Sequence, residues 1–417
     1  MQPTPPSRPA RGGGVYVHVP FCASICSYCH FARTDHHDAE LRRRTVEATL
    51  AELDLRRDQS SVLRAGLRPV DTLYIGGGTP SILEAELFRD LLDGLRGRLN
   101  LADDAEVTAE ANPESFDEDT AITWSQAGVN RVSLGVQSLR DGTLDLLGRA
   151  ADAATTRAAL ERACAHFDRV SADWILAPGV TPEALAAEFA EARALGVGHI
   201  SFYILEWHPG TALTRAAAEG RIAPDPDERV EAVYLAALSA LNALGYEQYE
   251  VSNACLPGQE SRHNSAYWRR RPYLGLGPGA HGFWGRRRHA NHAATDRYLA
   301  AIDAGRLPEA SWELLDGAAG RLEAAILALR TCEGVDLDRL AVSEEALAAG
   351  CAEELWVLDR HRLRLTTRGF LRIDAIESWL SSHVIVPERC ARVDTSGEGR
   401  LPCRDSKQHH PNGTTRA

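Results

Sequence analysis

Short apolar runs alternate with longer stretches of helical periodicity over the first half of the chain. The runs predict strands at Val15–Val19, Val70–Ile75, Glu106–Ala111, Arg131–Val136, Val170–Leu176 and His199–Leu205. Between them, stretches rich in Ala, Leu and Glu predict helices, among them Leu41–Leu55, Glu84–Leu95, Thr155–Cys164 and Pro182–Leu195. Repeated strand–helix units indicate a parallel sheet covered by helices, and therefore an α/β fold.

The second half of the chain has a weaker pattern. A helix leading away from the sheet is expected over about Asp225–Tyr249, after Pro224-Asp-Pro-Asp227. A second, mainly helical domain is expected to follow, with a hairpin at Leu363–Phe370. The predicted domains are therefore 15–224 and 225–380. The ends, residues 1–14 and 381–417, are poor in apolar residues and predict disordered tails.

Composition narrows the class of protein. With 417 residues, the chain is longer than one hydrophobic core usually supports. A net charge of -12 argues against nonspecific binding to nucleic acid. Nine cysteines, an odd number in so long a chain, indicate a reducing compartment rather than a disulfide framework. Because no signal sequence and no run of about 18 apolar residues is present, we expect a cytoplasmic protein that is not integral to a membrane.

Three cysteines follow the first predicted strand, in the run Cys22-Ala-Ser-Ile-Cys26-Ser-Tyr-Cys29. Structural zinc prefers a closed set of four ligands. A [4Fe-4S] cluster held by three thiolates keeps one iron open for an exchangeable ligand. The spacing therefore favours a cluster bound by Cys22, Cys26 and Cys29. A zinc knuckle with a distant fourth ligand, or three unlinked thiols, is the alternative.

Further motifs follow in a fixed order. They are Gly76-Gly-Gly-Thr-Pro-Ser81, Glu110-Ala-Asn-Pro113, Gly135-Val-Gln-Ser138 and His263-Asn-Ser-Ala-Tyr-Trp268. With the cysteine loop and the preceding Tyr16-Val-His-Val-Pro-Phe21, they resemble the radical S-adenosylmethionine (SAM) superfamily. Within it, they resemble the oxygen-independent coproporphyrinogen oxidase-like group and its HemW haem chaperones, over about 15–380. The resemblance implies a partial (βα)6 barrel and a smaller, mainly helical C-terminal domain, with the chemistry at the carboxyl ends of the strands.

The resemblance also implies that SAM binds at these strand ends. Its amino and carboxylate groups would chelate the open iron, and the glycine run would bring backbone amides to the methionyl end. The implied SAM contacts are Tyr16, Gly77, Gly78, Thr79, Glu110, Gln137, Arg149 and Asp173. Taken alone, the glycines could form a tight turn, and Glu110 and Arg149 could cap helices or pair with each other. Two departures from the family pattern, at Ala150-Ala151 and Ala177, leave open a scaffold that has lost SAM binding.

Two features bear on the choice between chaperone and oxidase. Phe31 stands two positions after the last cysteine, where the oxidases carry a fourth cysteine. The residues His263, Asn264, Tyr267 and Trp268 resemble the HNXXYW signature of haem-binding HemW proteins. On a helix, His263 and Tyr267 would share a face and could offer an imidazole and an aromatic surface to haem. A packing corner is the alternative for this motif, and His281 is a second candidate ligand.

The resemblance therefore implies a haem chaperone that carries a [4Fe-4S] cluster and SAM and that binds haem. Its partners would be a reductant for the cluster and recipient haem proteins, membrane-associated respiratory enzymes among the candidates. The alternative is an oxygen-independent coproporphyrinogen III oxidase, which decarboxylates its substrate to protoporphyrinogen IX. Phe31 and the HNXXYW motif favour the chaperone, so little or no porphyrinogen turnover is expected. No catalytic residue is assigned. His30, where the resemblance leads us to expect an acid, is either a solvated loop residue or a partner of the cluster.

Overall fold

The computed structural model describes residues 12–59, 69–315, 317–340 and 344–383. Most of the two predicted disordered tails lies outside the described residues. At their inner ends, the first strand begins at Gly13 and the last helix ends at His383, inside the ranges that the sequence assigned to the tails.

Six parallel strands form the centre of a twelve-stranded sheet and lie side by side in chain order. They are β1 (Gly13–Val19), β2 (Val70–Gly77), β3 (Leu101–Ala111), β4 (Arg131–Gln137), β5 (Val170–Leu176) and β6 (His199–Ile204). Both faces of these strands are covered, and every residue of β4 is buried. All six predicted strands are confirmed, and β3 starts earlier than expected because Leu101 already pairs with Val70 of β2, ahead of a register shift.

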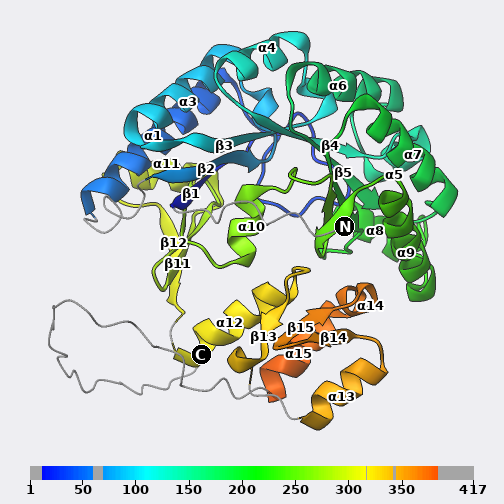
Figure 1. Ribbon diagram of the computed structural model, residues 1–417. Coiled ribbons are helices and arrows are strands. Elements are labelled where there is room, and N and C mark those ends of the chain that lie inside the picture. Colours follow the sequence, from blue (N-terminus) through cyan, green and yellow to red (C-terminus); the bar gives the residue numbers. More distant parts are fainter. Residues whose placement is uncertain (1–11, 60–68, 316, 341–343, 384–417) are drawn as a thin grey trace, which may run out of the picture.

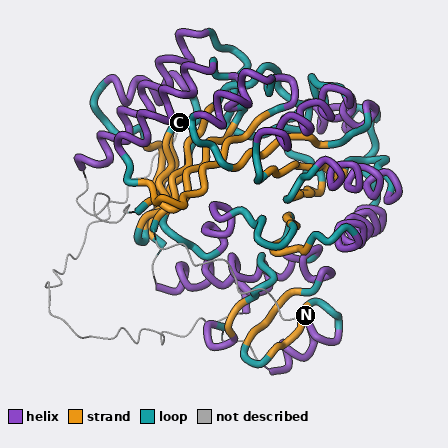
Figure 2. Tube along the Cα trace, turned by 45° about the horizontal axis from the view of Figure 1, so that its top comes forward, coloured by secondary structure: helices purple, strands orange, loops and turns teal. Residues whose placement is uncertain are grey.

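Helices cover the outer face of this sheet (Figure 1). They are α1 (Ala39–Gln59), α3 (Ala85–Arg98), α4 (Glu118–Gln126), α5 (Asp141–Leu147), α6 (Ala153–His166), α7 (Pro182–Leu195) and α8 (Ala212–Ala218), with 3-10 turns at Pro80–Ile82 and Pro113–Ser115. Local signals set the ends of α7: the Thr181 hydroxyl caps it, Pro182 opens it, and Gly196 closes it at φ 103°. The predicted helices near α1, α3, α6 and α7 are confirmed. In Figure 2 the outer layer of helices curves around the strands.

Part of the chain that the sequence assigned to a second domain adds strands to both edges of this sheet. Beyond β6 lie β8 (Asn253–Cys255) and β7 (Glu247–Glu250), and beyond β1 lie β9 (Tyr273–Leu276), β10 (His281–Trp284), β11 (Arg287–Asn291) and β12 (Glu309–Leu314). The helix α9 (Asp227–Ala243) packs beside α7 instead of leading away, and α11 (Thr295–Asp303) packs on α1. The predicted domain boundary near residue 225 is therefore wrong, because the barrel unit continues to Leu314.

A smaller C-terminal domain follows, with its own hydrophobic core around Leu329, Trp356, Phe370 and Leu380. It contains α12 (Gly317–Leu329), β13 (Val335–Asp336), a 3-10 turn at Leu337–Arg339, α13 (Glu344–Ala352), β14 (Trp356–Asp359), β15 (Arg362–Leu365), α14 (Thr367–Leu371) and α15 (Ile373–His383). The hairpin is present, but it joins β14 to β15, one strand earlier than predicted. The second part of the predicted hairpin forms α14, which the Thr366 hydroxyl caps.

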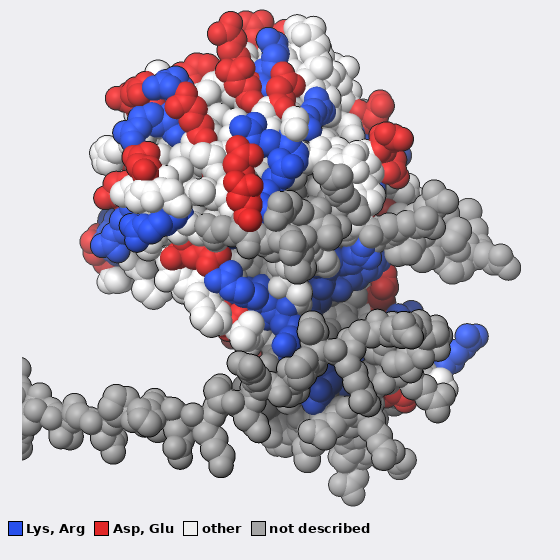
Figure 3. All heavy atoms as spheres, turned by 90° about the vertical axis from the view of Figure 1, so that its left-hand side faces the viewer, with Lys and Arg blue, Asp and Glu red and all other residues white. Residues whose placement is uncertain are grey.

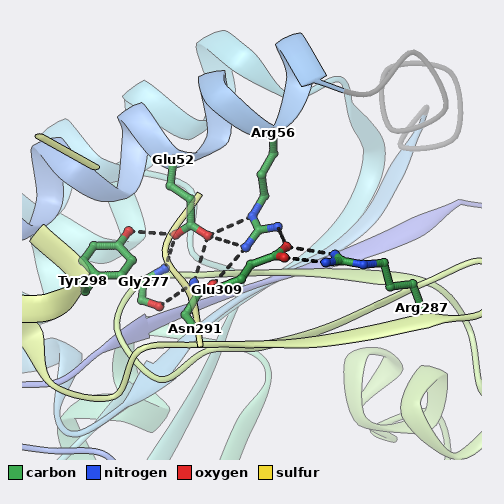
Figure 4. Close-up of polar contacts among 7 residues, drawn as sticks. All are labelled: Glu52, Arg56, Gly277, Arg287, Asn291, Tyr298 and Glu309. Atoms are coloured by element: carbon green, nitrogen blue, oxygen red, sulfur yellow. Dashed lines mark hydrogen bonds and ion pairs between the residues drawn. The ribbon is translucent and has the colours of Figure 1, made fainter. Parts of the chain in front are cut away.

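A buried polar network fastens α1 to the β9–β12 extension, residues 273–314 (Figure 4). The Glu52 carboxylate, fully buried, accepts four hydrogen bonds, from Arg56 Nε, Gly277 N, Asn291 Nδ2 and Tyr298 Oη, each of 2.7–2.8 Å. The Arg56 guanidinium also donates to Asn291 Oδ1 at 2.9 Å and to Glu309 Oε1 at 3.0 Å. Glu309 in turn pairs with Arg287. Both buried charges at the centre of the network are thus compensated by hydrogen-bonded partners.

The surface carries charges of both signs. On the side of the molecule shown in Figure 3, Asp and Glu side chains are interspersed with Lys and Arg side chains. Among the described helices, none combines the length and the apolar character that crossing a membrane would require.

Candidate functional site

The carboxyl ends of the parallel strands open into a cavity of about 740 Å³. It is lined by all three motif cysteines, by the predicted SAM residues Gly77, Gly78, Thr79, Glu110, Gln137, Arg149 and Asp173, and by Arg330, Phe370, Leu371, Ile373 and Asp374 of the C-terminal domain. The structure therefore brings the predicted cluster ligands and most of the predicted SAM contacts to one cavity. Tyr16 is the exception: it lines a smaller cavity deeper in the barrel.

The cysteine loop is held in place by main-chain hydrogen bonds. Cys22 N donates to Thr34 O at 3.0 Å, and Ser27 N donates to Leu147 O at 3.0 Å. The His18 ring reaches across from β1 and bonds to Ala32 O at 2.7 Å. Because the loop is tied to the barrel on both sides of the motif, its thiol groups face the cavity from fixed backbone positions.

Two side chains donate hydrogen bonds directly to the cysteine sulfurs. Thr79 Oγ1 lies 3.6 Å from Cys22 Sγ, and Arg149 Nη1 lies 3.3 Å from Cys26 Sγ. Burial raises the pKa of the Cys22 thiol to about 11, so its thiolate needs a cation or a metal. Among the described residues, no three His, Cys, Asp or Glu side chains converge as ligands of a single metal ion. A [4Fe-4S] cluster does not need three ligands at a single metal ion, because each thiolate binds a separate iron. Three thiols with a buried arginine beside them are suited to such a cluster.

The glycine run lets β2 approach the cysteine loop closely. A Cβ atom on Gly78 would lie 2.6 Å from Phe21 O and 3.0 Å from Cys22 Sγ. Gly77 has φ +118°, and a Cβ there would lie 2.7 Å from the His18 ring. Lack of space excludes a side chain at both positions, and at Gly77 the backbone conformation disfavours one as well. The glycine run therefore forms a turn and also brings the backbone of β2 close to the backbone of the cysteine loop.

Glu110 supports this loop from β3. Its carboxylate accepts a 2.6 Å hydrogen bond from Tyr74 Oη and a 3.0 Å hydrogen bond from Gly77 N. Burial raises the pKa of Glu110 to about 7. The pairing of Glu110 with Arg149 that the sequence left open does not form, since the carboxylate that lies near Arg149, at 3.7 Å, is that of Glu114.

Asp173 and Gln137 also line the main cavity. Burial raises the pKa of Asp173 to about 6. Hydrogen bonds from Ser201 and Ser133 stabilise its carboxylate and act in the opposite direction. Gln137 has φ +65° at the end of β4, a backbone conformation that a non-glycine residue rarely adopts. Despite the departures at Ala150-Ala151 and Ala177, both Arg149 and Asp173 line the cavity.

The HNXXYW motif forms α10 (Arg262–Trp268), which packs inside the barrel against the amino-terminal parts of β1 to β3. His263 is only 2% exposed, and its ring stacks on Tyr74 at 5.0 Å between centroids. Its Nδ1 bonds to Thr72 Oγ1 at 2.8 Å and its Nε2 to Tyr267 Oη at 2.7 Å. Burial lowers the pKa of His263 to about 3. The prediction that His263 lies in a second domain is wrong. Both nitrogens of its ring already form hydrogen bonds within the chain.

The other candidate haem residues do not all line one cavity. Asn264 and Tyr267 line the small internal cavity of about 210 Å³ together with His263. Trp268 lines a different cavity of about 370 Å³, beside Cys332 and Arg364 of the C-terminal domain. His281 is exposed on β10 and lines none of these three cavities. The motif does not form one continuous face toward a ligand here.

The sequence reasoning missed several residues on the main cavity wall. Asn112 links the two sulfur-bonding side chains: its Nδ2 donates to Thr79 Oγ1 at 3.0 Å, and its Oδ1 accepts from Arg149 Nη2 at 2.9 Å. It stands inside the motif that begins at Glu110, which was the available signal. His208 lies beside His30, with 3.4 Å between ring centroids. No motif marks His208, because it follows β6 and meets the cysteine loop only in the folded chain.

Comparisons with known proteins agree with this geometry. The family model of the Radical SAM superfamily matches residues 16–191. The chain is 38% identical to the heme chaperone HemW of Mycobacterium tuberculosis, over 88% of this chain and 94% of that protein. It is 32% identical to the mitochondrial radical S-adenosyl methionine domain-containing protein 1 of Mus musculus, over 86% of this chain and 77% of that one. Coproporphyrinogen III oxidase (HemN) from Escherichia coli shares the fold, with a TM-score of 0.74 at 22% identity over 89% of this chain and 91% of that one. The chain belongs to the HemW heme chaperone family of the radical SAM superfamily.

Proposed function

We propose that this protein is a haem chaperone, which binds haem and passes it to recipient haem proteins, and which carries a [4Fe-4S] cluster and SAM. Similarity to HemW along most of the chain supports the proposal. Cys22, Cys26 and Cys29 would hold the cluster. When bound, the cluster would supply an open iron for the amino and carboxylate groups of SAM.

The SAM site is proposed at the strand ends of the main cavity. Gly77 and Gly78 bring their backbone to the cavity wall beside the cysteine loop, and Asp173 offers a buried carboxyl group. A sulfonium cation would favour the ionised form of that carboxyl, offsetting the cost of burying it. Arg149 would counter the charge of the thiolates, since it already donates to Cys26 Sγ.

Phe31 is the observation that carries the choice of chaperone over oxidase. It replaces the fourth cysteine of the oxidase pattern, and its side chain is 57% exposed at the cavity. An exposed aromatic ring there cannot ligate a metal, but it offers apolar surface to a flat ligand.

One reconstituted sample tests both functions. After anaerobic reconstitution with iron and sulfide, the protein is titrated with haemin and separately assayed with coproporphyrinogen III, SAM and a low-potential reductant. We expect saturable haemin binding, transfer of haem to an apo-haem protein, and little or no protoporphyrinogen IX. Absence of haemin binding together with steady protoporphyrinogen IX formation would establish the oxidase instead.

A further inference from the structure

We infer that haem binds at the mouth of the main cavity, with the imidazole of His30 as its iron ligand, and not at the HNXXYW motif. This inference rests on the proposed haem-binding function and assigns a site to it. Three observations carry it: the engaged nitrogens of His263, the pair of histidines that lines the main cavity, and the exposed apolar side chains that line the same cavity.

His263, the histidine of the HNXXYW motif, is not accessible to a ligand. To coordinate iron, His263 would have to break its bond to Thr72 or to Tyr267 and leave its stacked position on Tyr74. Each buried polar group left behind would then lose a hydrogen bond, which is unfavourable in the barrel interior. The barrel interior around α10 would also have to open, because the internal cavity of about 210 Å³ is too small for a porphyrin.

His30 has the opposite surroundings. It lies on the cysteine loop directly after Cys29, it is exposed, and none of the described residues forms a hydrogen bond with its ring nitrogens. Its ring packs against the Phe31 ring at 4.8 Å and the His208 ring at 3.4 Å between centroids. The Thr211 and Thr214 hydroxyls both donate to the carbonyl oxygen of His208, and its ring Nε2 lies 2.7 Å from the Glu206 carboxylate. An accessible imidazole supported by a second ring suits axial ligation of haem.

The surroundings of His30 suit the flat apolar face of a porphyrin. Four of the large apolar side chains that are exposed in the described structure line this one cavity: Ile25, Phe31, Tyr203 and Ile204. Exposed apolar side chains gathered around a cavity mark a binding site more often than scattered ones do. Phe370 and Leu371 of the C-terminal domain line the same cavity.

The haem propionates would meet positive charge at the same place. Arg33 lines the cavity and donates to the carbonyl oxygens of Phe31 and Cys29. No carboxylate of the described residues lies within ion-pair distance of its guanidinium. A cation without a carboxylate partner is available to an anionic ligand. Haem placed at an open mouth would keep its outer face accessible to a recipient protein, which delivery requires.

Haemin titration of reconstituted variants tests this site. His30→Ala should lose the Soret band of imidazole-ligated haem and weaken haemin affinity at least tenfold, with the iron and sulfide content of the wild type. Phe31→Ser should weaken the affinity without changing the ligand signature. His36→Ala is the matched control, because that side chain is 97% exposed on the same loop, and it should titrate like the wild type.

The outcomes separate this inference from the proposed function. Wild-type protein that binds no haemin would overturn both. Normal haemin binding by His30→Ala, or its loss in His263→Ala with cluster content and fold intact, would overturn the site at the cavity mouth and leave the chaperone function standing. A His263→Ala variant that unfolds is replaced by Tyr267→Phe, which frees His263 Nε2 with a minimal change of shape. A changed haem ligand signature in Tyr267→Phe would equally overturn the site at the mouth.

Discussion

Two buried polar regions of this protein differ in what their charges contact. In the network around Glu52 and Arg56, every donor and acceptor at the centre is matched by another group of the chain (Figure 4). In the main cavity, by contrast, Asp173 and the Cys22 thiol are buried with fewer partners than their charged forms need. The first arrangement stabilises a fold, and the second is suited to a charged ligand that completes it. The predictions below test whether the two regions separate stability from binding.

Loss of one cysteine should have the largest effect, confined to the cavity. Cys26→Ala should abolish the broad absorbance near 400 nm after reconstitution, because three thiolates are the minimum that holds the cluster. Its apoprotein should unfold at nearly the same denaturant concentration as the wild type. Cys164→Ala, in α6, is the control and should reconstitute normally. Full iron and sulfide content in the Cys26 variant would remove the cluster from this site.

Loss of Arg56, the arginine of the network, should instead lower the stability of the fold. Arg56→Met removes the cation that Glu52 and Glu309 share and leaves Glu52 buried without it, and breaking a buried pair in this way costs about 3–5 kcal/mol. Equilibrium unfolding of the apoprotein measures it. Arg43→Met is the matched control on the same helix, because its ion pairs with Glu40 and Glu47 are exposed. Equal stability of the two variants would show that the network does not fasten the extension.

The glycine run should give a smaller effect on binding. A methyl group at Gly77 meets the His18 ring in a backbone conformation that disfavours side chains. Gly77→Ala should therefore lower SAM affinity by tenfold or more, which is about 1.4 kcal/mol. Calorimetry on reconstituted protein measures it. Gly142→Ala, where a Cβ meets nothing within 4 Å, should bind SAM as the wild type does. Unchanged affinity in the Gly77 variant would place SAM elsewhere.

The same two regions show what sequence could predict. The six parallel strands and the residues at their carboxyl ends were predictable, because a strand's position in a parallel sheet follows from chain order and period. The β9–β12 extension was not, since β9 joins β1 through main-chain hydrogen bonds that leave no side-chain pattern. The partners of Glu52 were hidden for a related reason: Asn291 and Tyr298 lie far along the chain and have no common motif.

The candidate site residues also divide into those that the sequence could predict and those that it could not. The cysteines and the glycine run were predictable because their chemistry lies within one short segment. The surroundings of His263 were not, because its partner Thr72 comes from a strand at the other end of the chain. The apolar cluster at the cavity mouth also combines distant segments, the cysteine loop with the end of β6. Spacing identifies ligands within a loop, whereas burial and exposure depend on the fold.

The dependence of stability on pH should differ in sign between the two regions. Burial raises the pKa of Glu110 to about 7, above its ordinary value near 4.5. Between those values the folded state keeps a proton that the unfolded state has lost, so this carboxyl's contribution to stability falls as pH rises toward 7. Burial also works against ionisation of Glu309, but hydrogen bonds from Arg287 and Arg56 lower its pKa to about 2. Its contribution is present above pH 4.5 and is lost as pH falls toward 2.

Glu110→Gln should therefore flatten the decline in apoprotein stability between pH 5 and pH 8 that the wild type shows. Unfolding by urea at a series of pH values measures the difference between the two proteins. Glu309→Gln should leave that decline in place and lower stability at both ends of the range, because Arg56 and Arg287 lose their carboxylate partner. The same pH profile in wild type and Glu110→Gln would mean that the Glu110 carboxyl is already compensated, as the network carboxylates are. In that case the comparison would rest on Asp173 and the cysteines alone.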